Sequence, residues 1–475
     1  MRLRELFDGL GEGQADPDVT TMALDSRTVT AGTLFCCVPG FEADGHDFAA
    51  AAVEQGAVAL LTERRLDLGV AEVVVDDVRA SLAPAAARLN GNPTAALEMV
   101  GITGTNGKTT SAFLTRALLE AGGKQSGLLG SVKQIVGRRP EPSFRTTPEA
   151  IDLQRCFAAM LAAGDDACTM EVSSHAIRLH RVDAIDWDVA IFTNLSYEHL
   201  DFHEDMEDYF DAKASLFRDT AAQAVINIDD AYGQRLADEI SGAITIGVES
   251  ADAELRALPV QADARSTRFT IDGLELTVPL PGQFNLLNAL GAVAAARSLG
   301  VDDASIATGL AAAELAPGRF EPINEGQGFA VIVDYAHTPD ALANVLKTAR
   351  QISSGRVIVL FGAGGDRDAT RRPLMGAAAS ADADLIFLTS DNPRSEDPLK
   401  IIDQIAQGID QGGPAVEIVV DRAEAISAAI ATAEPDDVLL IAGRGHERWQ
   451  ELAGGERIEF EDAAVARDAL RGRAA

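Results

Sequence analysis

The chain has 475 residues, of which 47% are hydrophobic, enough for about three domains of roughly 100 to 200 residues, each with its own core. Its 40 basic and 73 acidic residues give a formal net charge of −33 at pH 7, which opposes binding to nucleic acid and to anionic membranes. No stretch approaches the ~20 consecutive apolar residues that a membrane span requires, and the first residues lack the apolar run of a leader peptide. We therefore expect a soluble, cytoplasmic protein, and we expect a monomer.

Two residue types are scarce. The four cysteines, Cys36, Cys37, Cys156 and Cys168, form neither a CxxC pair nor a regular framework, which favours buried thiols over disulfides or a zinc site. Only six of the 40 basic residues are lysines. A lysine is therefore less likely to fall inside a motif by chance.

Residues 1–92 are expected to form a small α/β domain. Short β-like runs at 33–38, 58–62 and 72–75 alternate with alanine-rich helical segments such as 48–55. Such short apolar runs between helical segments are typical of buried strands.

A second domain is predicted over 93–317, after the turn-forming sequence Asn90-Gly91-Asn92-Pro93. A strand predicted over 97–103 leads into a glycine-rich loop and then into a helix predicted over 108–121. We expect a central parallel sheet of the P-loop ATPase type.

The third domain, 318–475, alternates strands with helices. Its predicted strands span 330–334, 357–361, 385–389, 416–420 and 438–441. This alternation predicts an α/β fold with a parallel, doubly wound, Rossmann-like sheet and right-handed crossovers.

A phosphate-binding loop is predicted at residues 101–110. The sequence Gly-Ile-Thr-Gly-Thr-Asn-Gly-Lys-Thr-Thr joins a predicted strand to a predicted helix, so backbone N–H groups and the helix N-terminus can hold phosphate oxygens. Lys108 can reach the β and γ phosphates of ATP, and Thr109 can bind Mg²⁺. The spacing differs from GxxxxGK[ST], because Ile102 stands five residues before Gly107. The residues assigned to ATP here are Gly104, Thr105, Asn106, Gly107, Lys108, Thr109 and Thr110.

Two further motifs combine carboxylate and imidazole groups. Glu171-Val-Ser-Ser-His175 ends an apolar run, and Asn194-Leu-Ser-Tyr-Glu-His199-Leu-Asp201 follows it. Such groups on separate loops can hold the metal ions that offset charge during phosphoryl transfer. Either histidine alone would instead be typical of a hydrogen-bonded structural residue.

Taken in this order, the phosphate loop and these two motifs resemble the Mur ligase family, and the resemblance covers essentially the whole chain. Leu24-Asp25-Ser26-Arg27 and Asp44-Gly45-His46 are similar to the uridine-nucleotide domain of members that add the third amino acid. The resemblance implies an ATP-dependent ligase of peptidoglycan synthesis that uses Mg²⁺. It would join meso-diaminopimelate to UDP-N-acetylmuramoyl-L-alanyl-D-glutamate through an acyl phosphate.

The resemblance also implies residues for the UDP-linked substrate and for catalysis. The residues implied for the UDP-linked substrate are Ser26, Thr146, Thr147, Ser173 and Arg181. The catalytic residues implied are Lys108, Glu171, His199 and Lys213, and the metal ligands implied are Thr109, Glu171, His199 and Lys213. The sequence around Lys213 favours by itself a surface lysine on a helix, whereas the family implies a carbamylated, anionic side chain. A desolvated neutral amine is nucleophilic enough to capture CO₂.

For ATP, the resemblance adds Asn285, Arg319, Asp334 and His337. By itself, the sequence around Asn285 is typical of a turn followed by a helix start. Arg319 lies near the junction with the third domain, and Asp334 and His337 follow the first strand of that domain.

Polar segments follow three predicted strands of the third domain, at 366–368, 391–394 and 443–447. Each alone is typical of a turn, but open α/β sheets bind ligands at the carboxyl ends of their strands. Arginine pairs bidentately with carboxylates, which suits an amino acid with an additional carboxylate. By resemblance, Arg394 meets the distal carboxylate of meso-diaminopimelate and Glu447 accepts its ammonium group. The full set implied for diaminopimelate is Arg367, Asp391, Asn392, Arg394, Gly443 and Glu447.

Three alternatives are open at this point. The chain could be a lysine-adding ligase of the same family, a folylpolyglutamate synthetase-like ligase, or a regulatory module that hydrolyses ATP as a switch. The first 92 residues and the sequence Asp-Asn-Pro-Arg at 391–394 favour the diaminopimelate ligase.

Overall fold

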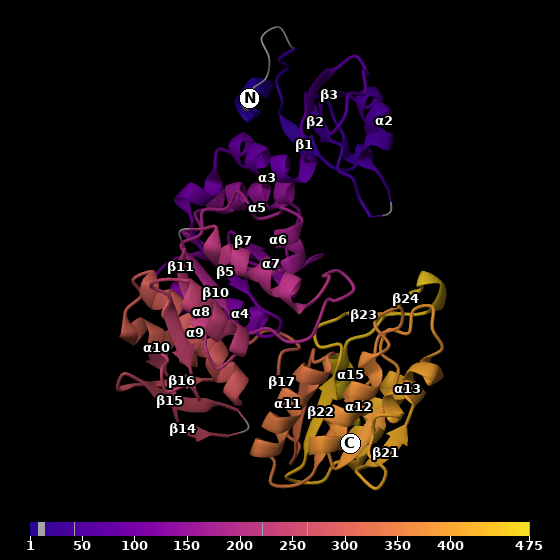
Figure 1. The fold of residues 1–475 in the computed structure, drawn as a ribbon. Coiled ribbons are helices and arrows are strands. Elements are labelled where there is room, and N and C mark those ends of the chain that lie inside the picture. The colour runs from indigo at the N-terminus through magenta and orange to yellow at the C-terminus, as the bar shows by residue number, and fades with distance from the viewer. Residues whose placement is uncertain (8–14, 42, 221, 264, 475) are drawn as a thin grey trace. The chain divides into compact units, whose positions relative to one another are not determined.

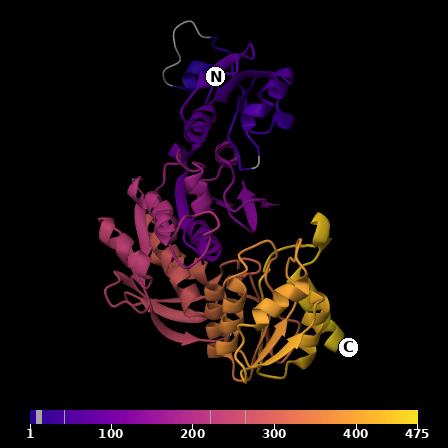
Figure 2. The ribbon, with the colours of Figure 1, turned by 45° about the vertical axis from the view of Figure 1, so that its right-hand side comes forward.

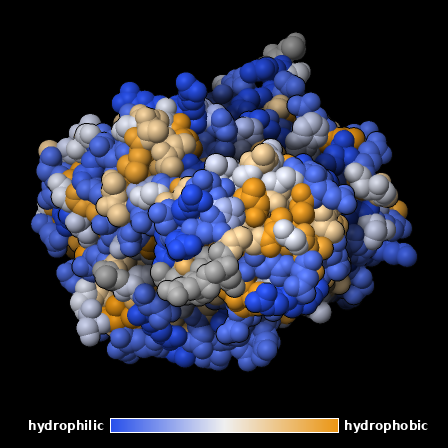
Figure 3. All heavy atoms as spheres, turned by 90° about the horizontal axis from the view of Figure 1, so that it is seen from above, coloured by the Kyte–Doolittle hydropathy of each residue, from blue (hydrophilic) through white to orange (hydrophobic). Residues whose placement is uncertain are grey.

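The computed structural model describes residues 1–7, 15–41, 43–220, 222–263 and 265–474. Contacts divide the chain into two compact units: Met1–Thr103 with Gly123–Ile191 and Glu207–Ala224, and Gly104–Gly122 with Phe192–Met206 and Val225–Ala475. Both contain parallel sheets with helices, which confirms the predicted α/β class. None of the described helices is long and apolar enough to cross a membrane. The face seen in Figure 3 is mostly hydrophilic, in keeping with the net charge.

The first unit opens with a four-stranded parallel sheet in the order β1-β2-β3-β4, drawn in indigo in Figure 1. Its strands are β1 (Thr21–Ala23), β2 (Thr33–Cys36), β3 (Ala57–Thr62) and β4 (Ala71–Val74). The helices around it are α1 (Leu3–Leu6), η1 (Ser26–Thr28), η2 (Gly45–Phe48), α2 (Ala49–Glu54), α3 (Val78–Leu89) and η3 (Pro93–Ala96). Leu34 and Leu61 join a core with α3, while Phe35 and Leu60 join a core with α2. Because both faces are covered, the strands read as continuous apolar runs, and the three predicted runs are confirmed to within two residues.

The first unit also holds part of a nine-stranded sheet, with strands in the order β10-β5-β9-β6-β7-β8. Its strands are β5 (Glu98–Thr103), β6 (Ser126–Leu129), β7 (Lys133–Val136), β8 (Arg139–Pro142), β9 (Ala167–Glu171) and β10 (Val189–Phe192). Its helices are α5 (Ala150–Ala163), α6 (Ser174–Arg178) and α7 (Met206–Arg218). Strands β5, β9 and β6 pair in parallel, so the carboxyl end of β5 precedes the phosphate loop and that of β9 carries Glu171.

The second unit begins with α4 (Lys108–Ala121), which confirms the helix predicted over the same residues. It packs against α9 (Gln283–Ser298) and α10 (Asp303–Ala311). Small buried residues such as Ala292 let α9 be covered nearly all round. The neighbouring elements are β11 (Gln223–Asn227), α8 (Ala231–Glu239), β12 (Ile244–Gly247), β13 (Leu255–Arg256), β14 (Leu258–Ala262), β15 (Thr267–Ile271) and β16 (Leu274–Val278). Strands β14, β15 and β16 form an antiparallel sheet.

The second unit ends in a six-stranded sheet in the order β17-β18-β22-β19-β20-β21, with helices on both faces (Figure 2). Its strands are β17 (Glu321–Ile323), β18 (Ala330–Asp334), β19 (Val357–Phe361), β20 (Leu385–Leu388), β21 (Ala415–Ile418) and β22 (Val438–Ala442). The helices are α11 (Pro339–Ile352), α12 (Arg371–Asp382), α13 (Pro398–Ala406), α14 (Arg422–Thr432) and α15 (Asp462–Ala474). A hairpin of β23 (Trp449–Glu451) and β24 (Arg457–Glu459) follows β22. All strands except β17 run parallel, which confirms the predicted Rossmann-like sheet.

A fully buried ion pair joins the first residues of α14 and α15. Arg422 donates from Nε and Nη2 to the carboxylate of Asp462, at 2.7 Å each, and neither side chain is exposed to solvent. The same Nη2 also donates to the carbonyl of Ala442 at the end of β22, at 2.9 Å. The pair therefore fixes two helix starts to the middle of the sheet.

Replacing Arg422 with methionine is expected to destabilise this sheet by roughly 3–5 kcal/mol, because the buried carboxylate of Asp462 would lose both hydrogen bonds from Arg422 and keep only the more distant Arg444, whose Nε lies 4.0 Å away. The double variant Arg422→Met/Asp462→Leu should recover most of that loss. Thermal unfolding of both variants and the wild type, followed by circular dichroism, measures the effect. Equal melting temperatures for the single variant and the wild type would contradict this account.

Candidate active site

Two glycines shape the loop that follows β5. Gly104 and Gly107 adopt φ values of 145° and 88°, which side chains rarely allow. A Cβ atom on Gly104 would lie 1.9 Å from Oγ1 of Thr193, and one on Gly107 would lie 2.3 Å from Oδ1 of Asn288. Each glycine therefore lets the loop backbone approach a polar side chain that any larger residue would displace.

Residues 193–198, here called the loop clamp, hold this loop by hydrogen bonds. The backbone N–H of Asn106 donates to Oδ1 of Asn194 at 2.9 Å, and the hydroxyl of Thr193 donates to the carbonyl of Asn106 at 2.6 Å. The N–H of Thr105 donates to the carbonyl of Asn194 at 2.9 Å. The loop is thus ordered by the protein itself.

The start of α4 offers hydrogen-bond donors to an anion. No side chain caps its first turn, and uncapped N–H groups at a helix N-terminus bind phosphate oxygens. The Nζ of Lys108 donates to the carbonyls of Gly104 and Thr105, at 2.9 Å each. The structure therefore brings all the predicted ATP residues from Gly104 to Thr110 into one cluster.

Glu198, in the loop clamp, is a buried carboxylate that sequence reasoning missed. Its oxygens lie 3.2 Å from Nε2 of His337 and 3.6 Å from Nε2 of His199. Burial acts to raise the pKa of Glu198, but His337, His199 and Lys108 hold that pKa well below its usual range. Desolvation acts to lower the pKa of His337, and the bond to Glu198 raises it overall. The only signal in the sequence was its place beside the predicted His199.

Asp334 and Arg319 lie near each other at the carboxyl end of β18. Asp334 accepts hydrogen bonds from the backbone N–H groups of Phe320 at 2.6 Å and of Ala336 at 2.7 Å, and burial raises its pKa despite the charge of Arg319. The guanidinium of Arg319 lies 4.3 Å from the centre of the Tyr335 ring. Its buried Nε has no hydrogen-bond partner among the described residues, so it can still serve a ligand.

Asn285 is buried and connects to α4 through a second asparagine. Its Nδ2 donates to the carbonyl of Pro281 at 2.8 Å, and its Oδ1 accepts from Nδ2 of Asn288 at 3.4 Å. Asn288 in turn accepts from the hydroxyl of Ser111 at 3.3 Å. Asn288, to which the sequence analysis gave no role, therefore joins the predicted nucleotide residue to the phosphate loop.

In the first unit, four of the five residues predicted for the UDP-linked substrate lie together. The hydroxyl of Thr147 donates to the carbonyl of Glu171 at 2.8 Å and accepts from the N–H of Ser173 at 3.1 Å. Arg181 donates to the carbonyl of Thr147 at 3.1 Å. Thr146 contacts the hydroxyl of Ser131 at 2.9 Å. Ser26 lies elsewhere in the unit, on η1, outside these contacts.

Glu171 is almost completely buried at the end of β9. Its carboxylate accepts from the N–H of Ser131 at 2.7 Å and from the hydroxyl of Ser131 at 3.2 Å. A Cβ atom on Gly130 would lie 2.4 Å from Oε1 of Glu171. This glycine therefore makes room for the carboxylate, and Ser131 is a contact that the sequence did not indicate.

Lys213 is only 1% exposed, so the surface position that its sequence context favours is wrong. It lies on the buried face of α7, and its Nζ is 4.6 Å from the centre of the Tyr209 ring. His199 adopts a left-handed φ of 58°, a conformation that is uncommon outside glycine. Glu171 and Lys213 belong to the first unit, and His199 belongs to the second. Among the described residues, no group of three or more His, Cys, Asp or Glu side chains is arranged to hold a metal ion.

The three polar segments of the C-terminal sheet follow the adjacent strands β22, β19 and β20. Asn392 donates from Nδ2 to Oε2 of Glu447 at 2.9 Å, and its carbonyl accepts from the N–H of Gly365 at 2.8 Å. A Cβ atom on Gly443 would lie 2.7 Å from Oδ2 of Asp391. Burial raises the pKa of Glu447, and the charge of Asp391 adds to that rise. A cation beside Glu447 would therefore be stabilised.

Two arginines flank Gly364 at the edge of this cluster. A Cβ atom there would lie 3.1 Å from Nη1 of Arg394 and 3.7 Å from Cγ of Arg367. Arg394 donates from Nη1 to the carbonyl of Gly365 at 2.7 Å, while Arg367 is exposed. The six residues predicted for diaminopimelate are thus brought to one end of the sheet.

Arg444 was missed by sequence reasoning, although it lies within the predicted segment 443–447. It is completely buried and donates from Nη1 to Oδ1 of Asn392 at 2.8 Å. It also donates to the carbonyl of Trp449 at 2.9 Å. Because Arg444 binds Oδ1 of Asn392, the Nδ2 of that amide faces Glu447.

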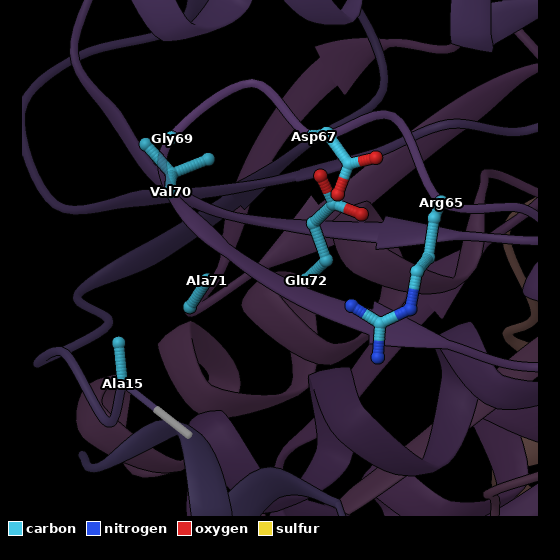
Figure 4. A pocket seen from close by; sticks show the side chains of 7 residues that line it. All are labelled: Ala15, Arg65, Asp67, Gly69, Val70, Ala71 and Glu72. Atoms are coloured by element: carbon cyan, nitrogen blue, oxygen red, sulfur yellow. The ribbon is translucent and has the colours of Figure 1, made fainter. Parts of the chain in front are cut away.

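A separate cavity of about 330 Å³ is lined by the segment that joins β3 to β4, by the start of β4 and by Ala15, and Figure 4 shows the side chains that line it. Among the described residues, its charged lining residues are Arg65, Asp67 and Glu72. The carboxylate of Glu72 accepts from the N–H groups of Leu66 at 3.0 Å and of Leu68 at 3.4 Å. None of the predicted site residues lines it.

Comparison with known proteins gives matches along the chain. The family model described as Mur ligase family, catalytic domain matches residues 18–96; Mur ligase middle domain matches 102–296; and Mur ligase, glutamate ligase domain matches 318–445. Over 471 residues, the chain is 44% identical to UDP-N-acetylmuramoyl-L-alanyl-D-glutamate--2,6-diaminopimelate ligase of Geobacillus thermodenitrificans, covering 96% of each chain.

Solved structures of Mur ligases also match this chain. A structure of UDP-N-acetylmuramoyl-L-alanyl-D-glutamate--2,6-diaminopimelate ligase matches with a TM-score of 0.71 and 32% identity, covering 100% of this chain and 99% of that one. MurF ligase from Thermotoga maritima, in complex with ADP, matches with a TM-score of 0.66 and 20% identity over 96% of both chains, which shows a shared fold. On the matched models and the full-length identity, this chain belongs to the Mur ligase family.

Proposed function

We propose that this chain is an ATP-dependent ligase that adds meso-diaminopimelate to UDP-N-acetylmuramoyl-L-alanyl-D-glutamate in peptidoglycan synthesis. Family membership supports the reaction class. The observation that carries the choice of amino acid is the cluster at the carboxyl ends of β20 and β22, where Asn392 bonds to Glu447 and shares Gly365 as a hydrogen-bond partner with Arg394. An arginine for a distal carboxylate and a carboxylate for an ammonium group suit a diamino diacid.

The reaction proceeds in two balanced steps. The γ-carboxylate of the D-glutamate attacks the γ-phosphorus of ATP, and the bond to ADP breaks to give an acyl phosphate. The amine of diaminopimelate then attacks the acyl carbon, expels inorganic phosphate and loses a proton. The loop N–H groups and Lys108 hold and neutralise the phosphates. Arg319 and His337 are proposed as further nucleotide contacts, with Asp334 and Asn285 fixing the surrounding backbone.

We propose Thr109, Glu171, His199 and a carbamylated Lys213 as the residues that would hold Mg²⁺. A bound Mg²⁺ would neutralise charge on the phosphate oxygens. The donor chemistry supports this, because Mg²⁺ prefers oxygen ligands, and carbamylation would convert a buried amine into two carboxylate-like oxygens. Thr146, Thr147, Ser173 and Arg181, together with Ser26, are proposed to bind the UDP-linked substrate.

The alternatives make different predictions about the amino acid. The substrate of a lysine-adding ligase is lysine, which has no distal carboxylate to pair with Arg394. A folylpolyglutamate synthetase-like enzyme would act on a folate rather than on a UDP-linked peptide. A regulatory switch would hydrolyse ATP without forming an amide.

The division into three domains, with boundaries at residues 92 and 317, is also a proposal.

Phosphate release with ATP and the UDP-linked dipeptide tests the function directly. We expect release to require meso-diaminopimelate, with L-lysine and no amino acid giving little, and to match amide product one to one. Release without amide product would support the regulatory switch instead.

In the same assay, Lys108→Ala should lower turnover by roughly 10³-fold, because the charge on the phosphates would lose its main cation.

Arg394→Ala is expected to raise the KM for diaminopimelate by about 30-fold or more, since truncating one partner of a buried charge pair costs roughly 2 kcal/mol or more. The KM for ATP should change by less than about twofold. Steady-state kinetics with each substrate varied in turn measures both. Equal losses for the two substrates would count against a specificity role.

Lys213→Ala is expected to lower turnover by at least about 100-fold, and added acetate should restore part of it by supplying the carboxylate oxygens. Acetate should have no such effect on the wild type or on Lys347→Ala, a matched control on α11. The absence of rescue at any acetate concentration would argue against carbamylation. Mass spectrometry of the native protein in bicarbonate provides a second readout.

A further inference from the structure

The hairpin β23–β24 brings a carboxylate against the proposed specificity residue. Glu451, the last residue of β23, accepts a hydrogen bond at Oε2 from Nε of Arg394 at 2.9 Å. The two backbones also meet, because the N–H of Arg394 donates to the carbonyl of Glu451 at 3.3 Å. The N–H of Glu451 donates to Oδ1 of Asn392 at 2.8 Å. Glu451 thus contacts two residues of the proposed amino-acid pocket.

The guanidinium of Arg394 is held from two sides. Glu451 takes the Nε hydrogen, and the carbonyl of Gly365 takes one hydrogen of Nη1. These bonds use two of the five N–H donors of an arginine. The remaining donors lie on Nη1 and Nη2, the end-on edge that pairs bidentately with a carboxylate.

A second arginine also contacts Glu451. Nε of Arg457 donates to Oε1 of Glu451 at 3.0 Å, so Glu451 is shared between Arg457 and Arg394. Burial acts to raise the pKa of Glu451, but the two arginines lower it overall, and the carboxylate stays ionised at neutral pH. Glu451 therefore does not pair with Arg394 alone, because Arg457 shares its carboxylate.

We propose that Glu451 is a positioning residue that orients Arg394 to receive the distal carboxylate of the amino-acid substrate. This inference rests on the proposed function. Arg394 has a left-handed φ of 49°, a conformation that is unfavourable outside glycine and persists only where neighbours enforce it. Glu451 supplies that enforcement through its backbone and its side chain together.

In an alternative interpretation, Glu451 competes with the substrate carboxylate for Arg394 and is displaced when the substrate binds. The geometry favours positioning, because Glu451 bonds to Nε rather than to Nη1 or Nη2, and because its other oxygen is engaged by Arg457. The two readings predict opposite changes when the carboxylate is removed.

Three substitutions separate geometry from charge. Glu451→Ala removes the acceptor, Glu451→Asp keeps the charge but shortens the reach, and Glu451→Gln keeps an acceptor oxygen without the charge. We expect Ala and Asp to raise the KM for diaminopimelate about tenfold and to reduce the preference over L-lysine, because a hydrogen bond to a charged group is lost. Gln should stay within about threefold of wild type. The KM for ATP should change by less than about twofold throughout.

Glu459→Ala is the matched control, because Glu459 is an exposed carboxylate on the facing strand, opposite Trp449, and its loss should leave all constants unchanged. Circular dichroism checks that each variant folds. A lower or unchanged KM for diaminopimelate in the Ala and Asp variants overturns the inference, as does a Gln variant as impaired as Ala. If the wild type shows no diaminopimelate-dependent phosphate release, the proposed function fails. If the wild type and Arg394→Ala behave as expected and only the Glu451 variants do not, this inference alone fails.

Discussion

The backbone of residues 104–107 can approach the loop clamp and α9 only because two of its positions carry no Cβ atom. That close approach lets the clamp order Asn106 and leaves the first turn of α4 without a side-chain cap. The clamp extends from there to Glu198, which contacts His337 at the start of the C-terminal sheet. Within the second unit, one set of hydrogen bonds therefore connects the phosphate loop to the sheet that carries the amino-acid cluster.

Charge is the main obstacle to the proposed reaction, since a chain of charge −33 must gather anionic substrates. The cations at the proposed sites are few and are held by neutral or shared partners. Lys108 donates to two carbonyls, while Arg444 donates to an amide and to carbonyls and also lies 3.6 Å from the carboxylate of Glu447. Neutral partners fix a cation in place without cancelling its charge. Such fixed charges act on a ligand without the cost of reorganising the site.

The sequence predicted those features that depend on a local pattern of residues, such as strands and the polar segments that follow them. Continuous apolar runs bounded by turns marked the strands, and the positions of polar segments after β19, β20 and β22 followed from them. The burial of Lys213 could not be predicted locally, because helix periodicity assigns a residue to a face but does not show what covers that face. Glu198 and Glu451 were missed because their partners are distant along the chain: Glu198 and His337 are 139 residues apart, and Arg394 and Glu451 are 57 apart. The left-handed turns at His199 and Arg394 likewise arise from tertiary contacts.

The order of strands in the C-terminal sheet has a consequence for how the chain is made. Strand β22 lies between β18 and β19, although about 80 residues of chain separate it from β19. At synthesis rates of roughly 5–20 residues per second, β19 leaves the ribosome about 4–16 s before β22, and β18, which ends about 100 residues before β22, leaves about 5–20 s before it. During that interval their apolar edges are unpaired, and exposed strand edges invite wrong pairing. The facing edges of β18 and β19 therefore stay without their native partner until β22, the last of the six strands along the chain, has been made, long after the segments that form the phosphate loop have emerged.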